Sequence, residues 1–164
     1  MPRKNPLARK RLDKYYRLAK DEGFKSRAAF KLLQINREFD ILGSCQCLLD
    51  LCAAPGGWTQ VALKSMPLSS LVVAVDLVKM KGIGGCKTIQ GDIFTQKCKF
   101  DIKKALGNIK PDVVLHDGSP DITGTWSKDS YAQCELTLQS LKLAAEFLKF
   151  GGIFVTKIFR SNDY

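Results

Sequence analysis

The sequence lacks the residue spacings of the common small metal and redox motifs. It has a single histidine, His116, and none of its six cysteines stands in a C-x-x-C pair with another. These absences exclude zinc-finger and thioredoxin patterns, so the sequence predicts no metal site. The cysteines are interpreted as reduced, partly buried small side chains; they are Cys45, Cys47, Cys52, Cys86, Cys98 and Cys134.

Long apolar runs are also missing. No stretch approaches the roughly 18 apolar residues of a membrane-spanning helix, and the basic N-terminus has no apolar segment of the kind found in secretion signals. At 164 residues with 45% hydrophobic content, the chain has the size and composition of one globular domain. We therefore expect a soluble, intracellular protein that makes no contact with membranes.

Positive charge is in excess and is concentrated at one end of the chain. The formal net charge is +10, and residues 1–37 carry 12 lysines or arginines against three acidic residues, which is +9. The other 127 residues carry 14 basic and 13 acidic groups. A basic segment beside a balanced domain is typical of nucleic-acid binding, and Tyr15, Tyr16 and Phe24 within it could stack on bases. A solvated tail or a localisation signal is the alternative.

Apolar patterns predict strands that alternate with helices. Strands that are apolar throughout are typical of a parallel sheet buried on both faces. The expected fold class is therefore α/β, a parallel sheet with helices on both faces. Strands are expected at 47–51, 71–77, 87–90, 112–116 and 152–159, and helices at 12–22, 58–65 and 95–106.

Two further helices have an apolar face that can be assigned from residue spacing. The first, which Ser26 could cap, has Ala28, Leu32, Ile35 and Phe39 on one face of a 3.6-residue repeat. Lys31 borders this face and could point into a cleft, or could lie at the edge of the stripe with its ammonium in water. In the second, a long helix, the face expected to pack on the sheet consists of Cys134, Leu138, Leu141, Ala145 and Leu148.

Charged residues stand where the expected strands end. Ligands of parallel α/β sheets lie beyond the carboxyl ends of the strands. Asp76, Asp92 and Asp117 stand at three such ends, and the fifth strand contains Lys157. An Asx turn or a helix cap would explain one such aspartate but is less persuasive for three. A lysine inside an apolar strand is costly unless it is functional or reaches water, so a function is the better interpretation of Lys157.

The first strand runs into the turn "CAAPGGW", residues 52–58. Its glycines allow positive φ and the close approach of another molecule to the backbone. Asp76, 20 positions after Gly56, suits the hydroxyls of a nucleoside ribose. Because the turn lacks the G-x-G-x-x-G spacing that seats a pyrophosphate, the sequence favours S-adenosylmethionine as cofactor and argues against a dinucleotide oxidoreductase.

Several segments together resemble the FtsJ family of RNA ribose 2′-O-methyltransferases. They are "SRAAFKL", "DLCAAPGGWTQVA", "VDLVKMK", "GDI", "LHDGSPD" and "GGIFVTKIFRSNDY", in this order, and they span nearly the whole chain. The wording of the last two is most similar to the eukaryotic Spb-type branch, which acts on nucleolar pre-rRNA. The resemblance implies a Rossmann-like, S-adenosylmethionine-dependent methyltransferase fold. It also implies a pre-rRNA substrate in pre-ribosomal particles, in the nucleus and nucleolus.

The resemblance also implies a set of site residues. Lys31, Asp117 and Lys157 match the first three members of the family's Lys-Asp-Lys-Glu catalytic set. Those that would line the S-adenosylmethionine site are Gly56, Trp58, Asp76, Asp92 and Asp117.

Each matched catalytic residue has an expected role. A ribose hydroxyl is a poor nucleophile, so the site needs alignment of the reactants and an acceptor for the hydroxyl proton. Lys157 is expected to be the base or orienting group, Asp117 to position it and face the cofactor, and Lys31 to give electrostatic support. Burial and Lys31 would lower the pKa of Lys157 whereas Asp117 would raise it, and the sequence leaves this balance open.

The sequence departs from the family pattern at its C-terminal end. The family's domain continues through a helix and strands that carry the catalytic glutamate, whereas this sequence stops at Tyr164. We therefore expect a piece of a longer protein, with a fold truncated before its last strands. Residues 1–23 are expected to form a basic RNA-contacting segment and residues 24–164 the methyltransferase domain. Asp121 and Lys25 stand where this branch often has asparagine and arginine.

Two other functions stay open beside pre-rRNA methylation. One is methylation of a transfer RNA, since related family members share most of the motifs. The other is a non-catalytic RNA-binding assembly module, which the matched lysines and aspartate argue against and the missing C-terminal portion argues for. The target nucleotide and the oligomeric state cannot be read from the sequence.

Overall fold

The computed structural model describes residues 6–81, 83–120, 124 and 126–158. Within these ranges, five parallel strands form one sheet in the order β3-β2-β1-β4-β5, with β1 at the centre. The elements along the chain are α1 (Pro6–Asp21), α2 (Ala29–Phe39), β1 (Cys47–Leu51), α3 (Gly57–Ser65), β2 (Leu71–Asp76), β3 (Lys87–Gln90), α4 (Gln96–Leu106), β4 (Val113–His116), α5 (Trp126–Phe147) and β5 (Ile153–Thr156).

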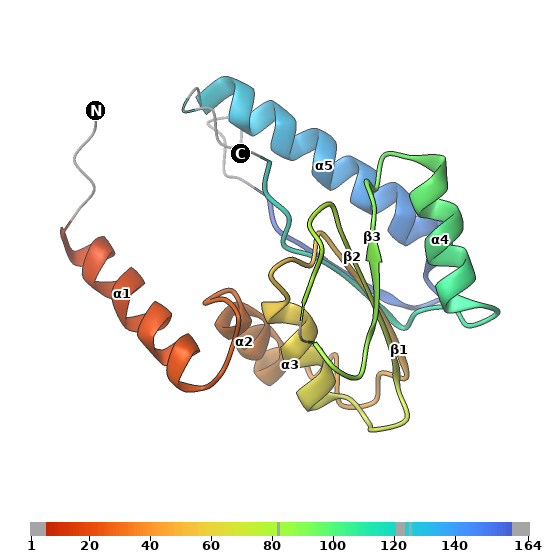
Figure 1. Ribbon diagram of the computed structural model, residues 1–164, viewed down its shortest axis with the longest axis horizontal. Coiled ribbons are helices and arrows are strands. Elements are labelled where there is room, and N and C mark those ends of the chain that lie inside the picture. The colour runs from red at the N-terminus through yellow and green to blue at the C-terminus, as the bar shows by residue number, and fades with distance from the viewer. Residues whose placement is uncertain (1–5, 82, 121–123, 125, 159–164) are drawn as a thin grey trace.

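Helices cover both faces of this sheet, as the sequence predicts (Figure 1). The helices α1, α2 and α3 lie on one side, and α4 and α5 lie on the other. Successive side chains of a strand point to opposite faces, so each apolar strand contributes to two cores. In β1, Leu48 packs with the first group of helices, while Leu49 and Leu51 pack with the second.

The parallel arrangement brings distant residues to one edge of the sheet. The last register pair between β4 and β5 is His116 with Thr156. Asp117 and Lys157 are the next residues of the two segments, so both lie just beyond the carboxyl ends of adjacent strands. The predicted strand at 152–159 included Lys157. In the structure β5 ends at Thr156, so Lys157 follows the strand.

The first two helices differ from their predicted ends. The helix α1 begins at Pro6, well before residue 12. The prediction that Ser26 caps α2 was wrong: Ala28 holds the N-cap position without a side-chain hydrogen bond, and the amide of Ala29 donates to the main-chain carbonyl of Ser26 at 3.2 Å. Phe39, predicted on the apolar face, is 66% exposed at the end of the helix.

Phe24, one of the three aromatic residues predicted to stack on bases, lies in the hydrophobic core instead. Phe24 is buried, and its ring packs edge-on against Phe30 with centroids 5.9 Å apart. Tyr15 also contacts Phe30, at 5.7 Å between centroids, and is partly exposed. Tyr16 is the most exposed of the three, so the stacking surface is smaller than predicted.

The buried face of α5 was predicted wrongly. Leu138 and Leu141 are 51% and 49% exposed, whereas Leu143 and Ala144 are buried against the sheet. The buried face also includes two polar residues, Gln133 and Ser140. Because the prediction counted only apolar positions, it chose the neighbouring stripe of the helix. No helix in the described ranges is both long and apolar enough to cross a bilayer.

Candidate active site

The turn after β1 has a backbone that requires glycine. Gly56 has φ of 108° and holds the N-cap position of α3. A Cβ atom at this position would lie 2.0 Å from the Cδ1 atom of Ile83, so a side chain would be strained and would collide with the following loop. Gly56 thus shapes the turn but does not line either of the two cavities described below.

Trp58, directly behind the turn, joins α3 to the start of α2. Its indole N–H donates to the carbonyl of Ala28 at 2.8 Å, and the side chain is buried in the core next to α2. Part of the residue also lines the smaller of the two cavities. A tryptophan here therefore fixes the distance between two helices that border the site.

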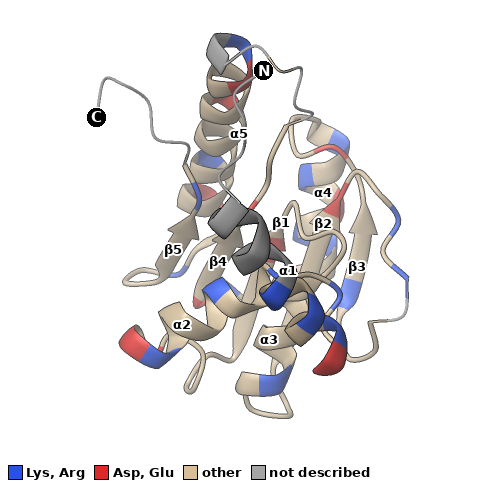
Figure 2. Ribbon diagram, turned by 90° about the vertical axis from the view of Figure 1, so that its left-hand side faces the viewer, with Lys and Arg blue, Asp and Glu red and all other residues tan. Residues whose placement is uncertain are grey.

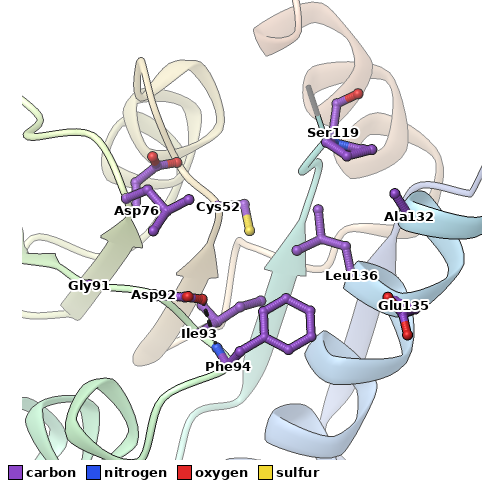
Figure 3. A pocket seen from close by; sticks show the side chains of 12 residues that line it. Cys52, Asp76, Gly91, Asp92, Ile93, Phe94, Ser119, Ala132, Glu135 and Leu136 are labelled. Atoms are coloured by element: carbon purple, nitrogen blue, oxygen red, sulfur yellow. Dashed lines mark hydrogen bonds between the residues drawn. The ribbon is translucent and has the colours of Figure 1, made fainter. Parts of the chain in front are cut away.

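A cavity of about 390 Å³ lies beyond the carboxyl ends of β1 and β2. Figure 3 shows Asp76 and Asp92 on the strand side of this cavity and Glu135 on α5 opposite them. The Phe94 side chain contributes an aromatic wall, and Cys52 lies between the two sides. The cavity therefore combines carboxylates with apolar and aromatic surface.

Both aspartates of this cavity also hold the backbone around it. Asp76 accepts the amide of Ala54 at 2.8 Å through Oδ2 and that of Val78 at 2.8 Å through Oδ1. Asp92 accepts the amide of Phe94 at 2.9 Å. The hydrogen bonds from Val78 to Asp76 and from Phe94 to Asp92 each join a side chain to the amide two residues later. They are Asx turns, the alternative that the sequence left open. Each carboxylate oxygen can accept a further hydrogen bond, so these turns leave both residues able to bind a ligand.

A second, much smaller cavity of about 30 Å³ shares Cys52 with the first and is lined by Asp50, Trp58 and Asp117. Asp50 is fully buried inside β1, and burial raises the pKa of its carboxyl to about 7. The hydroxyl of Thr59 donates to it at 2.6 Å, which opposes that increase. A buried carboxyl of this kind is stabilised in its charged form by a cationic ligand.

The three predicted catalytic residues meet beside this smaller cavity. The ammonium of Lys31, from α2, donates to the two carboxylate oxygens of Asp117 at 3.1 and 3.2 Å. The ammonium of Lys157 lies 3.5 Å from Oδ1 of Asp117 and donates to the main-chain carbonyl of the same residue at 2.9 Å. One carboxylate is thus shared by two lysines, whose side chains are 55% and 24% exposed.

The structure gives the balance that the sequence left open for Lys157. Its pKa is lowered from the ordinary lysine value of 10.5, chiefly by burial, with Asp117 opposing the change and Lys31 adding to it. Burial also lowers the pKa of the neighbouring His116 to about 4, with a smaller contribution from the charge of Lys157. At neutral pH His116 is therefore uncharged, and a larger fraction of Lys157 is neutral amine than in an exposed lysine.

Sequence reasoning missed several residues of this site. Asp50 carried a usable signal, because an aspartate inside the apolar run "CLLDL" is as costly as the lysine that was singled out. Phe94 and Glu135 carried none, since nothing local marks them as neighbours of Asp76. Asp121 lies outside the described residues. In the described part of the chain, no group of three or more His, Cys, Asp or Glu side chains is placed to hold a metal ion.

A family model for FtsJ-like methyltransferases matches residues 24–164. The chain belongs to the FtsJ-like methyltransferase family. A pre-rRNA 2′-O-ribose RNA methyltransferase of Dictyostelium discoideum is 56% identical over 162 residues, which is 99% of this chain and 19% of the relative. An AdoMet-dependent rRNA methyltransferase of Mycosarcoma maydis is 55% identical over 157 residues, 96% of this chain and 17% of the relative.

The FtsJ-like chain spans about a fifth of the length of the curated relatives that it matches. Among solved structures, a Plasmodium falciparum protein described as a ribosomal RNA methyltransferase has a TM-score of 0.77 and 26% identity. That match covers 85% of this chain and 81% of the other. The Rossmann-like methyltransferase fold expected from the sequence is therefore confirmed.

Proposed function

We propose that this FtsJ-like protein transfers the methyl group of S-adenosylmethionine to a ribose 2′-hydroxyl of ribosomal RNA precursor, in large-subunit ribosome biogenesis. The observation that carries the proposal is the cluster of Lys31, Asp117 and Lys157 beside two cavities that share Cys52 in their lining. Relatives more than half identical over nearly the whole chain are named as methyltransferases of this kind of RNA.

The residues that line the two cavities offer groups that could bind the parts of S-adenosylmethionine. Asp76 and Asp92 offer acceptors for ribose hydroxyls, and Phe94 offers a flat apolar surface for an adenine ring. The buried Asp50 and the nearby Asp117 offer negative charge for the cationic methionine end. When bound, S-adenosylmethionine supplies a methyl group that is already activated by its sulfonium sulfur.

Lys157 is the proposed group that receives or orients the 2′-hydroxyl proton. Its lowered pKa increases the fraction of neutral amine, which alone can accept a proton. Asp117 holds the Lys157 ammonium through its carboxylate and its main-chain carbonyl, so the lysine has a fixed direction. Lys31 places a second positive charge at the same carboxylate, where it supports the neutral form of Lys157 and attracts the RNA backbone.

We further propose that residues 1–23 contact RNA and that residues 24–164 form the methyltransferase domain. The side chains of Lys14, Arg17 and Lys20 are exposed on α1. In Figure 2, where lysine and arginine are blue, much of the described part of α1 is blue. Ribosomal RNA precursor is made in the nucleolus, so we place the protein in the nucleus and nucleolus, within pre-ribosomal particles.

The function is tested by mapping 2′-O-methylated nucleotides in total RNA from cells with and without the full-length protein. We expect loss of methylation at one or a few positions of large-subunit ribosomal RNA, with restoration when the protein is supplied again. Loss of methylation only in transfer RNA would show that transfer RNA, and not ribosomal RNA precursor, is the substrate. An unchanged map would contradict the proposed activity and favour a non-catalytic assembly module.

Neutralising α1 should weaken RNA binding. We expect the triple variant Lys14→Gln, Arg17→Gln, Lys20→Gln to bind RNA less tightly, because each lysine or arginine that neutralises a phosphate releases counterions on binding. The slope of log affinity against log salt should fall by roughly 0.7 to 0.9 for each phosphate that is no longer neutralised. Titration of RNA at several salt concentrations measures this slope, and affinity for S-adenosylmethionine should not change.

A matched variant on α4 provides the control. Lys97, Lys103 and Lys104 are exposed on the opposite face of the sheet from α1, and their replacement by glutamine removes the same charge. An equal decrease in slope for both triple variants would contradict a specific role of α1.

A further inference from the structure

Gln133 is a buried polar residue of α5 that contacts the backbone on both sides of the catalytic cluster. It is 1% exposed, and its Nε2 atom donates to the carbonyl of Gly118 and to the carbonyl of Lys157, both at 3.2 Å. Gly118 directly follows Asp117. One amide group therefore joins the segment that carries the catalytic aspartate to the catalytic lysine itself.

This link lies where the sheet no longer fixes the chain. The ladder between β4 and β5 ends at the pair His116 and Thr156, followed by one hydrogen bond from the amide of Lys157 to the carbonyl of His116 at 3.0 Å. Beyond that point, α5 supplies the support, since Thr137 also donates to the carbonyl of Lys157, at 3.4 Å. A buried amide is costly unless its hydrogen bonds are satisfied, and Gln133 satisfies its donors on these two segments.

The surroundings of Gln133 contain a second unusual feature. Its Oε1 atom and the Nε2 atom of His116 are both buried without a hydrogen-bond partner among the described residues. The Nδ1 atom of His116 contacts the hydroxyl of Thr156 at 2.8 Å. A Cβ atom on Gly118 would lie 2.5 Å from Nε2 of His116, so glycine is needed for the loop to pass this close. The interior behind the cluster is therefore polar and tightly packed.

We propose that Gln133 is a positioning residue for methyl transfer, which sets the Lys157 side chain against Asp117 by holding their two main-chain segments together. The inference rests on the proposed function of the same site. Gln133 would affect the chemical step without touching the cofactor or the RNA.

The test replaces Gln133 by methionine in the full-length protein, because methionine keeps the length and apolar stem but cannot donate. We expect kcat for RNA methylation to fall about 10-fold to 100-fold, with KM for RNA and affinity for S-adenosylmethionine within about 2-fold. The control is Ser140→Ala, another buried polar residue of α5, whose hydroxyl donates to the carbonyl of Leu136 in the same helix. It should leave kcat unchanged.

A second measurement reports on Lys157 without any activity. Competitive labelling with a trace amount of acetic anhydride over a range of pH gives the pKa of individual lysines, with the exposed Lys142 as internal reference. In the described part of the chain, the titratable groups that face Lys157 include Asp117 and His116 of the β4 segment, Lys31 of α2 and Cys52 after β1. If Gln133 holds Lys157 among them, the Gln133→Met protein should show the pKa of Lys157 moved up towards the ordinary lysine value of 10.5.

The outcomes separate the two proposals. A folded Gln133→Met protein with unchanged kcat and unchanged labelling of Lys157 would overturn the role of Gln133. If that variant does not fold, Gln133→Leu, which fills a similar volume without an amide donor or an added charge, gives the same two readouts. A parent protein that transfers no methyl group would overturn the proposed function, and the labelling would still decide whether Gln133 positions Lys157.

Discussion

Replacement of Lys157 by methionine in the full-length protein is expected to reduce methyl transfer to RNA by about two to four orders of magnitude, the usual contribution of a general base. The affinity for S-adenosylmethionine should stay within about 1 kcal/mol, because in the proposed mechanism the lysine acts on the hydroxyl and not on the cofactor. The ammonium of Lys157 is held at Asp117, and its pKa lies below the ordinary value. Single-turnover methylation and calorimetry measure the two quantities.

The pH dependence of the parent protein provides a further check on Lys157. Only the neutral amine accepts a proton, so the transfer rate should rise with pH. Because burial lowers the pKa of Lys157 below 10.5, the rate should level off below that pH. The variant Lys142→Met, which removes an exposed lysine from α5, should behave as the parent. Full activity of Lys157→Met would contradict the assignment of the base.

Replacement of Asp76 by alanine is expected to weaken binding of S-adenosylmethionine by about 1 to 3 kcal/mol, the cost of losing hydrogen bonds to a charged acceptor. The carboxylate lines the larger cavity and also holds the amides of Ala54 and Val78. Calorimetry with the parent should show binding of S-adenosylmethionine and S-adenosylhomocysteine, and no binding of NAD.

The control for Asp76 is Asp101→Ala, which removes a carboxylate paired with Lys97 on the outside of α4. It should bind the cofactor as the parent does. Unchanged affinity in Asp76→Ala would show that this carboxylate only shapes the turn, and saturable binding of NAD in preference to S-adenosylmethionine would contradict the proposed chemistry.

Much of the sheet could be predicted because most of its strands are short apolar runs with clear breaks; the exposed strand β3, with the sequence KTIQ, is not apolar. All five residues of β1 are buried, and its apolar pattern alone indicates a strand of a parallel sheet covered on both faces. The strand-end position of Asp76 and Asp117 follows from the same pattern. The apolar pattern does not predict the contact between Asp117 and Lys31, because that contact depends on how α2 packs on the sheet. Only the family resemblance implied that these two residues belong to one site.

The errors have a common physical cause. Periodicity arguments assume that apolar residues face the core, whereas α5 turns Gln133 and Ser140 inward. Phe24 was treated as a surface aromatic residue because its sequence neighbours are charged, although its ring packs in the core. In each case packing between distant segments decided the burial, and local sequence carries little information about such packing.

The cluster of Lys31, Asp117 and Lys157 also has a consequence for the order of folding. Lys31 and Asp117 are 86 positions apart, and Asp117 and Lys157 are 40 positions apart. Contacts between distant positions form late, since the entropy of closing long loops is lost before the contacts stabilise the chain. The cluster cannot exist until Lys157 has left the ribosome and β5 has joined β4. During synthesis, the proposed competence for methylation would therefore be among the last properties that these residues acquire.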